Sequence, residues 1–312
     1  MGQLVNGVWH DVWYETAKTG GRFERPVQQF RNWVTADGSS GFPAEAGRYR
    51  LYVSLACPWA HRTLIFRALK GLEDAIPVSI VSPYMRNEGW VFDGTPGSTD
   101  EPLYGLGRLY ELYVKAKPDF TGRVTVPVLW DTRTGTIVNN ESSEIIRMFN
   151  SAFDGLAAHP DRDFYPEELR AEIDAVNALV YDTVNNGVYK AGFATTQEAY
   201  EEAFDALFVT LDRLEALLDG RSHLVGERAT EADWRLFTTL VRFDPVYVGH
   251  FKCNLRRIAD YPNLSRYLWR LHDTPGVAAT CNLDHIKTHY YASHTTINPT
   301  GIVPKGPAIG RP

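Results

Sequence analysis

The chain has 312 residues, of which 44% are hydrophobic and 22% charged, the composition of a globular protein large enough for two domains. A net charge of -6 excludes a generally basic surface for nucleic acid, and three cysteines are too few for a disulfide framework. The sequence begins without a secretory signal and contains no apolar stretch long enough to span a bilayer. We therefore expect a cytoplasmic protein that binds neither membranes nor nucleic acid.

The first part of the chain predicts an extension followed by a strand, a helix and a second strand. Residues 1–45 show no sustained period and are predicted to pack on the body as an extension. Alternation over 48–54 predicts a strand, and the apolar run at 77–81 predicts a second, buried strand. Between them, the apolar stripe over 58–70 predicts a helix that ends at Gly71. This order implies a parallel pair of strands joined by a right-handed crossover.

The next segment is irregular before strand signals return. Glycine and proline are frequent over 82–122, so we expect a long inserted loop, and loops of this length are usually functional. Residues 124–130 and 135–139 predict the two strands of a hairpin, and 141–150 predicts a helix. The resulting order of elements is typical of a thioredoxin-like α/β domain, which we place at 46–155.

Strand signals stop beyond about residue 160. Thr230 and Asp233 match a capping box that has Asp in place of the usual Glu. These features predict an all-α domain over 160–294 and an irregular tail over 295–312. The helical periods within that domain run over 166–186, 197–218, 262–273 and 276–291.

Cys57 carries the chemical prediction. It lies where the first predicted strand meets the first predicted helix, with Pro58 in the first helical turn. The unpaired N–H groups and positive end of a helix stabilise a thiolate, which is the nucleophilic form of cysteine. The residue three positions on is Ala60, so an external thiol would have to resolve any disulfide at Cys57. The alternative is a structural cysteine, which is how we interpret Cys253 and Cys281.

The two predicted domains together resemble the architecture of glutathione transferases, and two local motifs agree. Val126-Pro127 matches the cis-proline of that superfamily, where the preceding backbone faces the cysteinyl part of glutathione. Glu141-Ser142 matches its γ-glutamyl recognition pair, in which a carboxylate suits an ammonium and a helix N-terminus suits a carboxylate.

More narrowly, the chain resembles the glutathionyl-hydroquinone reductases, also called Xi-class glutathione transferases. The resemblance covers nearly the whole length and departs at none of the positions that we assign to catalysis. Its motifs are CPWAHR at 57–62, NEGWVF at 87–92, TGRVTVPVLWD at 121–131, NESSEIIRM at 140–148, NNGVYKAGF at 185–193, RFDPVY at 242–247 and HYY at 289–291.

The resemblance implies a reaction in two steps. A ring carbon of a glutathionyl-hydroquinone is protonated, and the Cys57 thiolate then attacks the glutathione sulfur and releases the hydroquinone. Free glutathione attacks the mixed disulfide, releases oxidised glutathione and restores Cys57. Tyr189 and Tyr290 are implied to line the hydroquinone site, with Tyr291 as an alternative to Tyr290.

Trp90 and Arg123 are implied to hold the glycine end of glutathione. Each implied residue has a plainer alternative: helix packing for the tyrosines, the core for Trp90, a solvated charge for Arg123 and a first-turn helix residue for Glu141. His61 and Arg62 either add positive potential near the thiol or face solvent.

The resemblance makes glutathione the cosubstrate and predicts a homodimer. The chain has no nicotinamide fingerprint, and its C-terminal histidines (His285, His289 and His294) complete no zinc pattern, so we expect neither a nicotinamide nor a metal. Two other functions stay open. One is an omega-like transferase acting as a thioltransferase or dehydroascorbate reductase, and the other is a non-catalytic module with the same fold.

Overall fold

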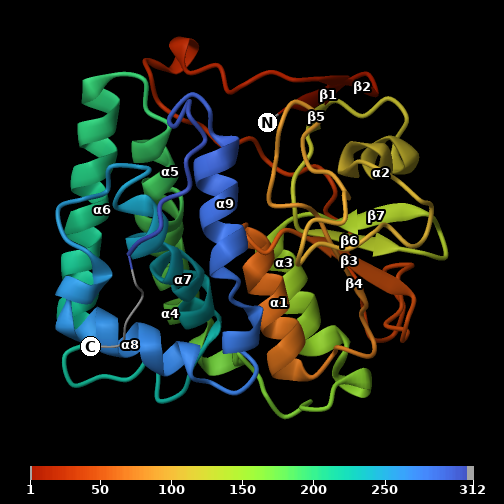
Figure 1. Ribbon diagram of the computed structural model, residues 1–312. Helices are drawn as coiled ribbons and strands as arrows, with labels where there is room; N and C mark the ends of the chain where they lie inside the picture. The colour runs from red at the N-terminus through yellow and green to blue at the C-terminus, as the bar shows by residue number, and fades with distance from the viewer. Residues whose placement is uncertain (1, 308–312) are drawn as a thin grey trace. The chain divides into compact units, whose positions relative to one another are not determined.

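The structure is a computed structural model that describes residues 2–307, and the chain divides into two compact units (Figure 1). Unit 1 combines residues 2–13 with Pro26–Asp163 and Ala279–His294. Unit 2 combines Tyr14–Arg25 with Phe164–Ala278 and residues 295–307. The compact units are therefore discontinuous in sequence, whereas the predicted domains are continuous stretches.

Unit 1 is built on a four-stranded sheet in the order β4-β3-β6-β7. The central strand β3 (Tyr49–Val53) pairs in parallel with β4 (Val78–Ile80), as the strand-helix-strand pattern predicts. It pairs antiparallel with β6 (Val128–Asp131). Strand β6 forms a hairpin with β7 (Thr136–Asn139), which confirms the hairpin predicted over 124–139. All of β6 is buried, so the core of unit 1 lies against this strand.

Two helices of unit 1 contact each other along the sheet, α1 (Pro58–Lys70) and α3 (Ser142–Arg147) (Figure 1). Helix α1 has the predicted bounds and ends at Gly71, whose φ of 64° is the left-handed conformation that glycine favours. Helix α3 continues as a π-helical turn over Met148–Ala152, so the predicted helix extends slightly past its expected end.

The expectation that residues 82–122 form an irregular loop is wrong. The inserted loop contains helix α2 (Leu109–Ala116) and strand β5 (Gly122–Arg123). The N-terminal extension contains β1 (Gln3–Val5) and β2 (Val8–His10), and these form a second sheet in the order β2-β1-β5. Strands of two or three residues are too short to show a period in the sequence, which is why the pattern misses them.

Unit 2 is helical, and its element bounds follow the predicted periods closely. The buried helix at its centre is α7 (Glu231–Arg242), which begins with the predicted Thr230 and Asp233 capping box. All twelve of its residues are buried. The other helices are α4 (Arg170–Val180), α5 (Gly187–Gly192), α6 (Gln197–Leu217) and α8 (Pro262–His272), with π-helical turns at Tyr181–Asn185 and Phe243–Tyr247.

The last predicted helix is shorter than expected. Helix α9 (Leu283–Ser293) begins after Asn282, whose side chain accepts from the His285 N–H and caps the helix. This helix packs in unit 1, although it follows the helices of unit 2 in sequence. The described part of the tail has no helix or strand, and residues 308–312 lie outside the described chain. Short 3-10 turns lie at Ala17–Thr19, Asp154–Leu156, Glu167–Leu169, Ile258–Asp260 and Ala278–Thr280.

Within residues 2–307, no helix has both the length and the apolar character needed to cross a membrane.

Candidate active site

Cys57 occupies the N-cap of α1, as the sequence predicts. Its backbone is extended, and Pro58 is the first helical residue. The Cys57 N–H donates to the Ser54 carbonyl at 3.1 Å, and its carbonyl accepts from the His61 N–H at 2.9 Å. The half-buried thiol is therefore fixed at the positive end of a 13-residue helix, where a thiolate is stabilised.

The thiol faces the turn that precedes β6. The Cys57 Sγ lies 3.6 Å from the carbonyl oxygen of Val126, and the Val126–Pro127 peptide bond is cis. The Tyr113 hydroxyl of α2 donates to the Thr125 carbonyl at 2.8 Å and accepts from the Thr125 N–H at 3.2 Å. Burial raises the pKa of Tyr113, so its phenol stays neutral and able to donate. Helix α2 therefore fixes the turn that faces the cysteine.

Glu141 and Ser142 begin helix α3. Glu141 is the N-cap, and its Oε1 accepts from the Ser143 N–H and hydroxyl, both at 3.0 Å. Its Oε2 accepts from none of the described residues. Ser142 is buried, and its Oγ lies 3.4 Å from Nη1 of Arg62 in α1. Glu141 therefore caps α3 instead of lying in its first turn, and the cap uses only one of its two carboxylate oxygens.

His61 and Arg62 are both fully buried in unit 1, so the alternative in which they face solvent is wrong. The Arg62 guanidinium lies 4.5 Å from the centroid of the Trp59 ring. The His61 Nε2 lies 2.7 Å from the Thr280 Oγ1 and 3.8 Å from the Cys281 Sγ. Their contacts hold the first turns of α1 against neighbouring elements of the same unit.

Trp90 and Arg123 have partners that sequence reasoning did not identify. Trp90 is buried and stacks on the His289 imidazole, with ring centroids 4.8 Å apart and an interplanar angle of 22°. The Arg123 guanidinium donates to the main-chain carbonyls of Val12 and Trp13. Arg123 therefore fixes the N-terminal segment of unit 1.

The two neighbouring tyrosines on α9 differ in their burial. Tyr290 is buried, whereas Tyr291 is half-buried. The Tyr290 ring meets the His289 ring at 5.4 Å and the His294 ring edge-on at 5.5 Å. Tyr290 is thus held in a cluster of aromatic side chains within unit 1.

Tyr189 lies on α5 in unit 2, in a second aromatic cluster. Its ring centroid lies 5.7 Å from that of Phe193, 6.2 Å from Tyr247 and 5.4 Å from Phe251. The Arg25 guanidinium covers the Tyr189 ring at 5.0 Å from its centroid. No sequence signal pointed to Arg25, because it lies 164 positions earlier in the irregular extension and outside every motif.

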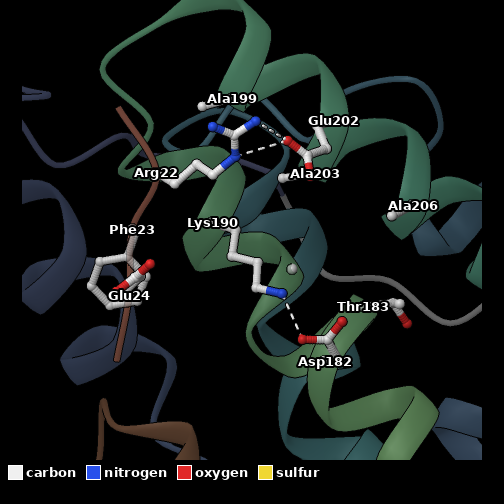
Figure 2. Close-up of a pocket in the computed structure, with 11 residues that line it drawn as sticks. Arg22, Phe23, Glu24, Asp182, Thr183, Lys190, Ala199, Glu202, Ala203 and Ala206 are labelled. Carbon is white, nitrogen blue, oxygen red and sulfur yellow. Dashed lines mark hydrogen bonds and ion pairs between the residues drawn. The ribbon is translucent and has the colours of Figure 1, made fainter. Parts of the chain in front are cut away.

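A cavity of about 350 Å³ lies in unit 2 between the segment Tyr14–Arg25 and helices α5 and α6. Figure 2 shows Arg22 reaching Glu202 and Lys190 reaching Asp182, at 2.7 and 2.6 Å. Both cations are thus paired with carboxylates. The small residues of the wall are Gly187, Ala199, Ala203 and Ala206. None of the predicted site residues lines this cavity.

Cys253 is fully buried, and burial raises the pKa of its thiol, as expected for a structural cysteine. Across residues 2–307, no three His, Cys, Asp or Glu side chains are arranged to hold a metal ion.

Two family profiles match the chain. The glutathione S-transferase N-terminal domain matches residues 56–152, and the glutathione S-transferase C-terminal domain matches residues 197–270. Both the thioredoxin-like first domain and the helical second domain that the sequence predicts are therefore confirmed.

Individual relatives are similar over nearly their whole length. Glutathionyl-hydroquinone reductase YqjG of Escherichia coli strain K12 is 59% identical over 98% of this chain and 95% of its own. Glutathionyl-hydroquinone reductase PcpF of Sphingobium chlorophenolicum is 59% identical over 99% of this chain and 97% of its own.

Solved structures agree. The glutathione-bound structure of YqjG superposes with a TM-score of 0.91 and 56% identity, over 99% of this chain and 96% of that chain. The Xi-class enzyme from Natrialba magadii superposes with a TM-score of 0.93 and 50% identity, over 99% and 94%. This chain belongs to the Xi class of the glutathione transferase family, the group of the glutathionyl-hydroquinone reductases.

Proposed function

We propose that this protein reduces glutathionyl-hydroquinones to hydroquinones at the expense of glutathione. The observation that carries the proposal is the Cys57 thiol at the N-terminus of α1, 3.6 Å from the Val126 carbonyl before a cis-proline. Nearly full-length identity of 59% to two glutathionyl-hydroquinone reductases supports the same reaction.

Glutathione is the cosubstrate, and unit 1 supplies residues suited to each part of it. The backbone of Val126 pairs with the cysteinyl part, next to Pro127. The Ser142 hydroxyl at the start of α3 binds the γ-glutamyl carboxylate, and the Glu141 Oε2 binds its ammonium. The Glu141 Oε1 accepts the hydrogen bond that caps α3, and this bond holds the carboxylate so that its Oε2 keeps a fixed position.

Trp90 and Arg123 serve the glycine end. The Trp90 ring, which is stacked on the His289 imidazole, packs against the glycine end of glutathione. Arg123 attracts the glycine carboxylate through its charge while holding the carbonyls of Val12 and Trp13.

The tyrosines act on the aromatic ring. A ring carbon that bears the glutathione sulfur takes a proton from the phenol of Tyr189 or Tyr290. The hydroquinone oxygen gives up its own proton to water as the ring becomes a keto tautomer. The Cys57 thiolate then attacks the glutathione sulfur. The carbon–sulfur bond breaks, its electron pair returns to the ring as an enolate, and protonation gives the hydroquinone.

Free glutathione completes the cycle. Its thiolate attacks the glutathione sulfur of the mixed disulfide, which restores the Cys57 thiolate and forms oxidised glutathione. The residue three positions after Cys57 is Ala60, and helix α1 contains no second cysteine that could resolve the disulfide. The resolving thiol must therefore come from the cosubstrate.

The experiment is anaerobic turnover of a glutathionyl-hydroquinone with excess glutathione by wild type, Cys57→Ser and Cys281→Ser. Cys281 is half-buried like Cys57 and makes a matched control. We expect hydroquinone and oxidised glutathione from the wild type and from Cys281→Ser, and neither from Cys57→Ser. A wild type that releases no hydroquinone but reduces small mixed disulfides would instead be an omega-like thioltransferase.

We further propose a homodimer in the cytoplasm. Two-fold assemblies are the commonest among soluble proteins, and a reducing compartment keeps both glutathione and Cys57 in the thiol form. Gel filtration with light scattering tests the first statement, and cell fractionation tests the second.

A further inference from the structure

The segment Tyr14–Arg25 is part of unit 2 and is anchored to its helices along its length. The Gly21 carbonyl accepts from the Thr195 N–H at 3.0 Å, and the Gly20 carbonyl accepts from the Thr196 hydroxyl at 3.1 Å. Gly21 has a φ of 84°, and a Cβ there would lie 2.6 Å from the Thr196 side chain. The backbone therefore lies directly against the start of α6.

Arg25 ends this segment and makes two contacts with helix α5. Its Nε donates to the Oδ1 of Asn186 at 2.9 Å, and its guanidinium lies 5.0 Å from the centroid of the Tyr189 ring. Asn186 is buried, and its main-chain carbonyl accepts from the Tyr189 N–H at 2.9 Å. Arg25 thus binds the first turn of the helix that carries Tyr189 and covers the face of its ring.

Phe23 and other aromatic rings enclose Tyr189 further. The Phe23 ring lies 6.4 Å from the Tyr189 ring and 5.5 Å from the Arg25 guanidinium. Phe193 and Phe251 pack on Tyr189 from within unit 2. A ring enclosed by aromatic neighbours and a cation has little freedom to rotate, so its hydroxyl keeps a fixed direction.

We propose that Arg25 is a positioning residue for Tyr189, which it holds in the orientation for proton donation and whose phenolate it stabilises. The inference rests on the proposed function, because Tyr189 needs an acid role only if an aromatic carbon–sulfur bond is cleaved. Arg25 acts through Tyr189 and has no part in the exchange between Cys57 and glutathione.

The proposed step moves one proton. The Tyr189 hydroxyl gives its proton to the ring carbon that bears sulfur, and the phenolate that remains carries a negative charge. The positive charge of the Arg25 guanidinium offsets that negative charge from the face of the ring. The phenolate regains its proton from water when the hydroquinone leaves. Tyr189 therefore acts as an acid only and is neither oxidised nor reduced.

Arg22 provides a matched control in the same segment. Its guanidinium donates from Nε and Nη2 to Oε2 of Glu202 on α6, as Figure 2 shows. Arg22 is exposed, and it pairs with α6 instead of with α5. Removing the Arg22 charge therefore alters the segment without altering the face of Tyr189.

The test compares Arg25→Met, Arg25→Lys, Arg22→Met and Tyr189→Phe in two assays with the full-length protein. One is anaerobic release of menadiol from glutathionyl-menadiol, and the other is reduction of the mixed disulfide of glutathione and 2-mercaptoethanol. We expect Tyr189→Phe to lower kcat for menadiol release by about a hundredfold and Arg25→Met by about tenfold, with KM unchanged. Arg25→Lys keeps the positive charge but loses the planar guanidinium, so its kcat for menadiol release should fall about threefold.

Reduction of the small disulfide needs no ring protonation, so Arg25→Met, Arg25→Lys and Arg22→Met should perform it at the rate of the wild type. Arg22→Met should release menadiol at that rate too. Adding Arg25→Met to Tyr189→Phe should cause no further loss, because both changes remove the same proton transfer.

Three results would overturn the inference: equal losses in both assays for Arg25→Met, an equal loss from Arg22→Met, or additive losses in the double variant. The first would indicate a general role in folding. A wild type that reduces the small disulfide but releases no menadiol would overturn the proposed function, and this inference with it.

Discussion

Replacing Asp233 with alanine should remove the main support of the N-terminus of α7. The Asp233 Oδ1 accepts from the Leu224 N–H at 2.9 Å and the Tyr267 hydroxyl at 2.8 Å. Its Oδ2 accepts from the Thr230 N–H at 2.7 Å and the Thr230 hydroxyl at 3.1 Å. Asp233 is fully buried, so water cannot replace the lost acceptor.

The magnitude follows from the donors that lose their partner. Two buried main-chain N–H groups and one buried phenol are left unpaired, and each costs about 1–3 kcal/mol. Burial raises the pKa of Asp233, so some of the cost of burying its charge is recovered in the variant. We expect a net loss of about 3–5 kcal/mol in the free energy of unfolding of unit 2.

The matched control is Thr230→Val, which keeps the Asp233 carboxylate and three of its four contacts. That change removes only the hydroxyl and should cost about 1 kcal/mol. The measurement is urea unfolding followed by circular dichroism, compared at a constant m-value. The reasoning is refuted if Asp233→Ala falls within about 1 kcal/mol of Thr230→Val.

Helix α7 also supports the turn that leads into α5, the helix that carries Tyr189. Asn185 donates from Nδ2 to the Thr239 Oγ1 at 2.8 Å and to the Arg235 carbonyl at 3.1 Å. Asn185 lies four residues before Tyr189, so α7 holds the turn that leads into α5. Asp233→Ala should therefore slow hydroquinone release even at temperatures where the protein stays folded.

Three further changes test separate parts of the account. Glu141→Gln keeps the capping oxygen and removes the charge, so the KM for glutathione should rise about tenfold while the melting temperature hardly changes; an unchanged KM would contradict the assignment. Burial lowers the pKa of His250 from 6.5 to about 4, so the unfolded chain takes up the proton first, and roughly 3 kcal/mol of stability is lost as the pH falls from 6.5 to about 4. His250→Gln should make urea unfolding less sensitive to pH in that range, and an unchanged pH dependence would refute the cause. Gly21→Ala places a side chain against Thr196 on a residue with left-handed backbone, and it should lower the free energy of unfolding of unit 2 by about 2 kcal/mol in the same measurement. An unchanged free energy of unfolding would show that the backbone moves to make room.

Local signals explain what the sequence predicted well. The bounds of α1 and the capping box of α7 each depend on residues within a few positions of one another. The parallel pairing of β3 and β4 follows from the order strand, helix, strand along the chain. The cis bond at Val126–Pro127 came from the family resemblance and is present.

The contacts that the sequence did not predict join residues that are far apart along the chain. Leu4 pairs with Gly122 in the second sheet, and Trp90 stacks on His289 almost two hundred positions away. Arg25 reaches Tyr189 from a segment without any period. None of these pairs leaves a local pattern, because each depends on how the chain folds back on itself.

We expect the reaction to pass through a mixed disulfide between Cys57 and glutathione. One turnover of glutathionyl-menadiol without free glutathione, followed by mass spectrometry of the digested protein, tests it directly. We expect one menadiol to be released per active chain and one glutathione to be attached to Cys57, and this glutathione should be removed when free glutathione is added. Menadiol release without an adduct, or an adduct on Cys253 or Cys281 in place of Cys57, would contradict it.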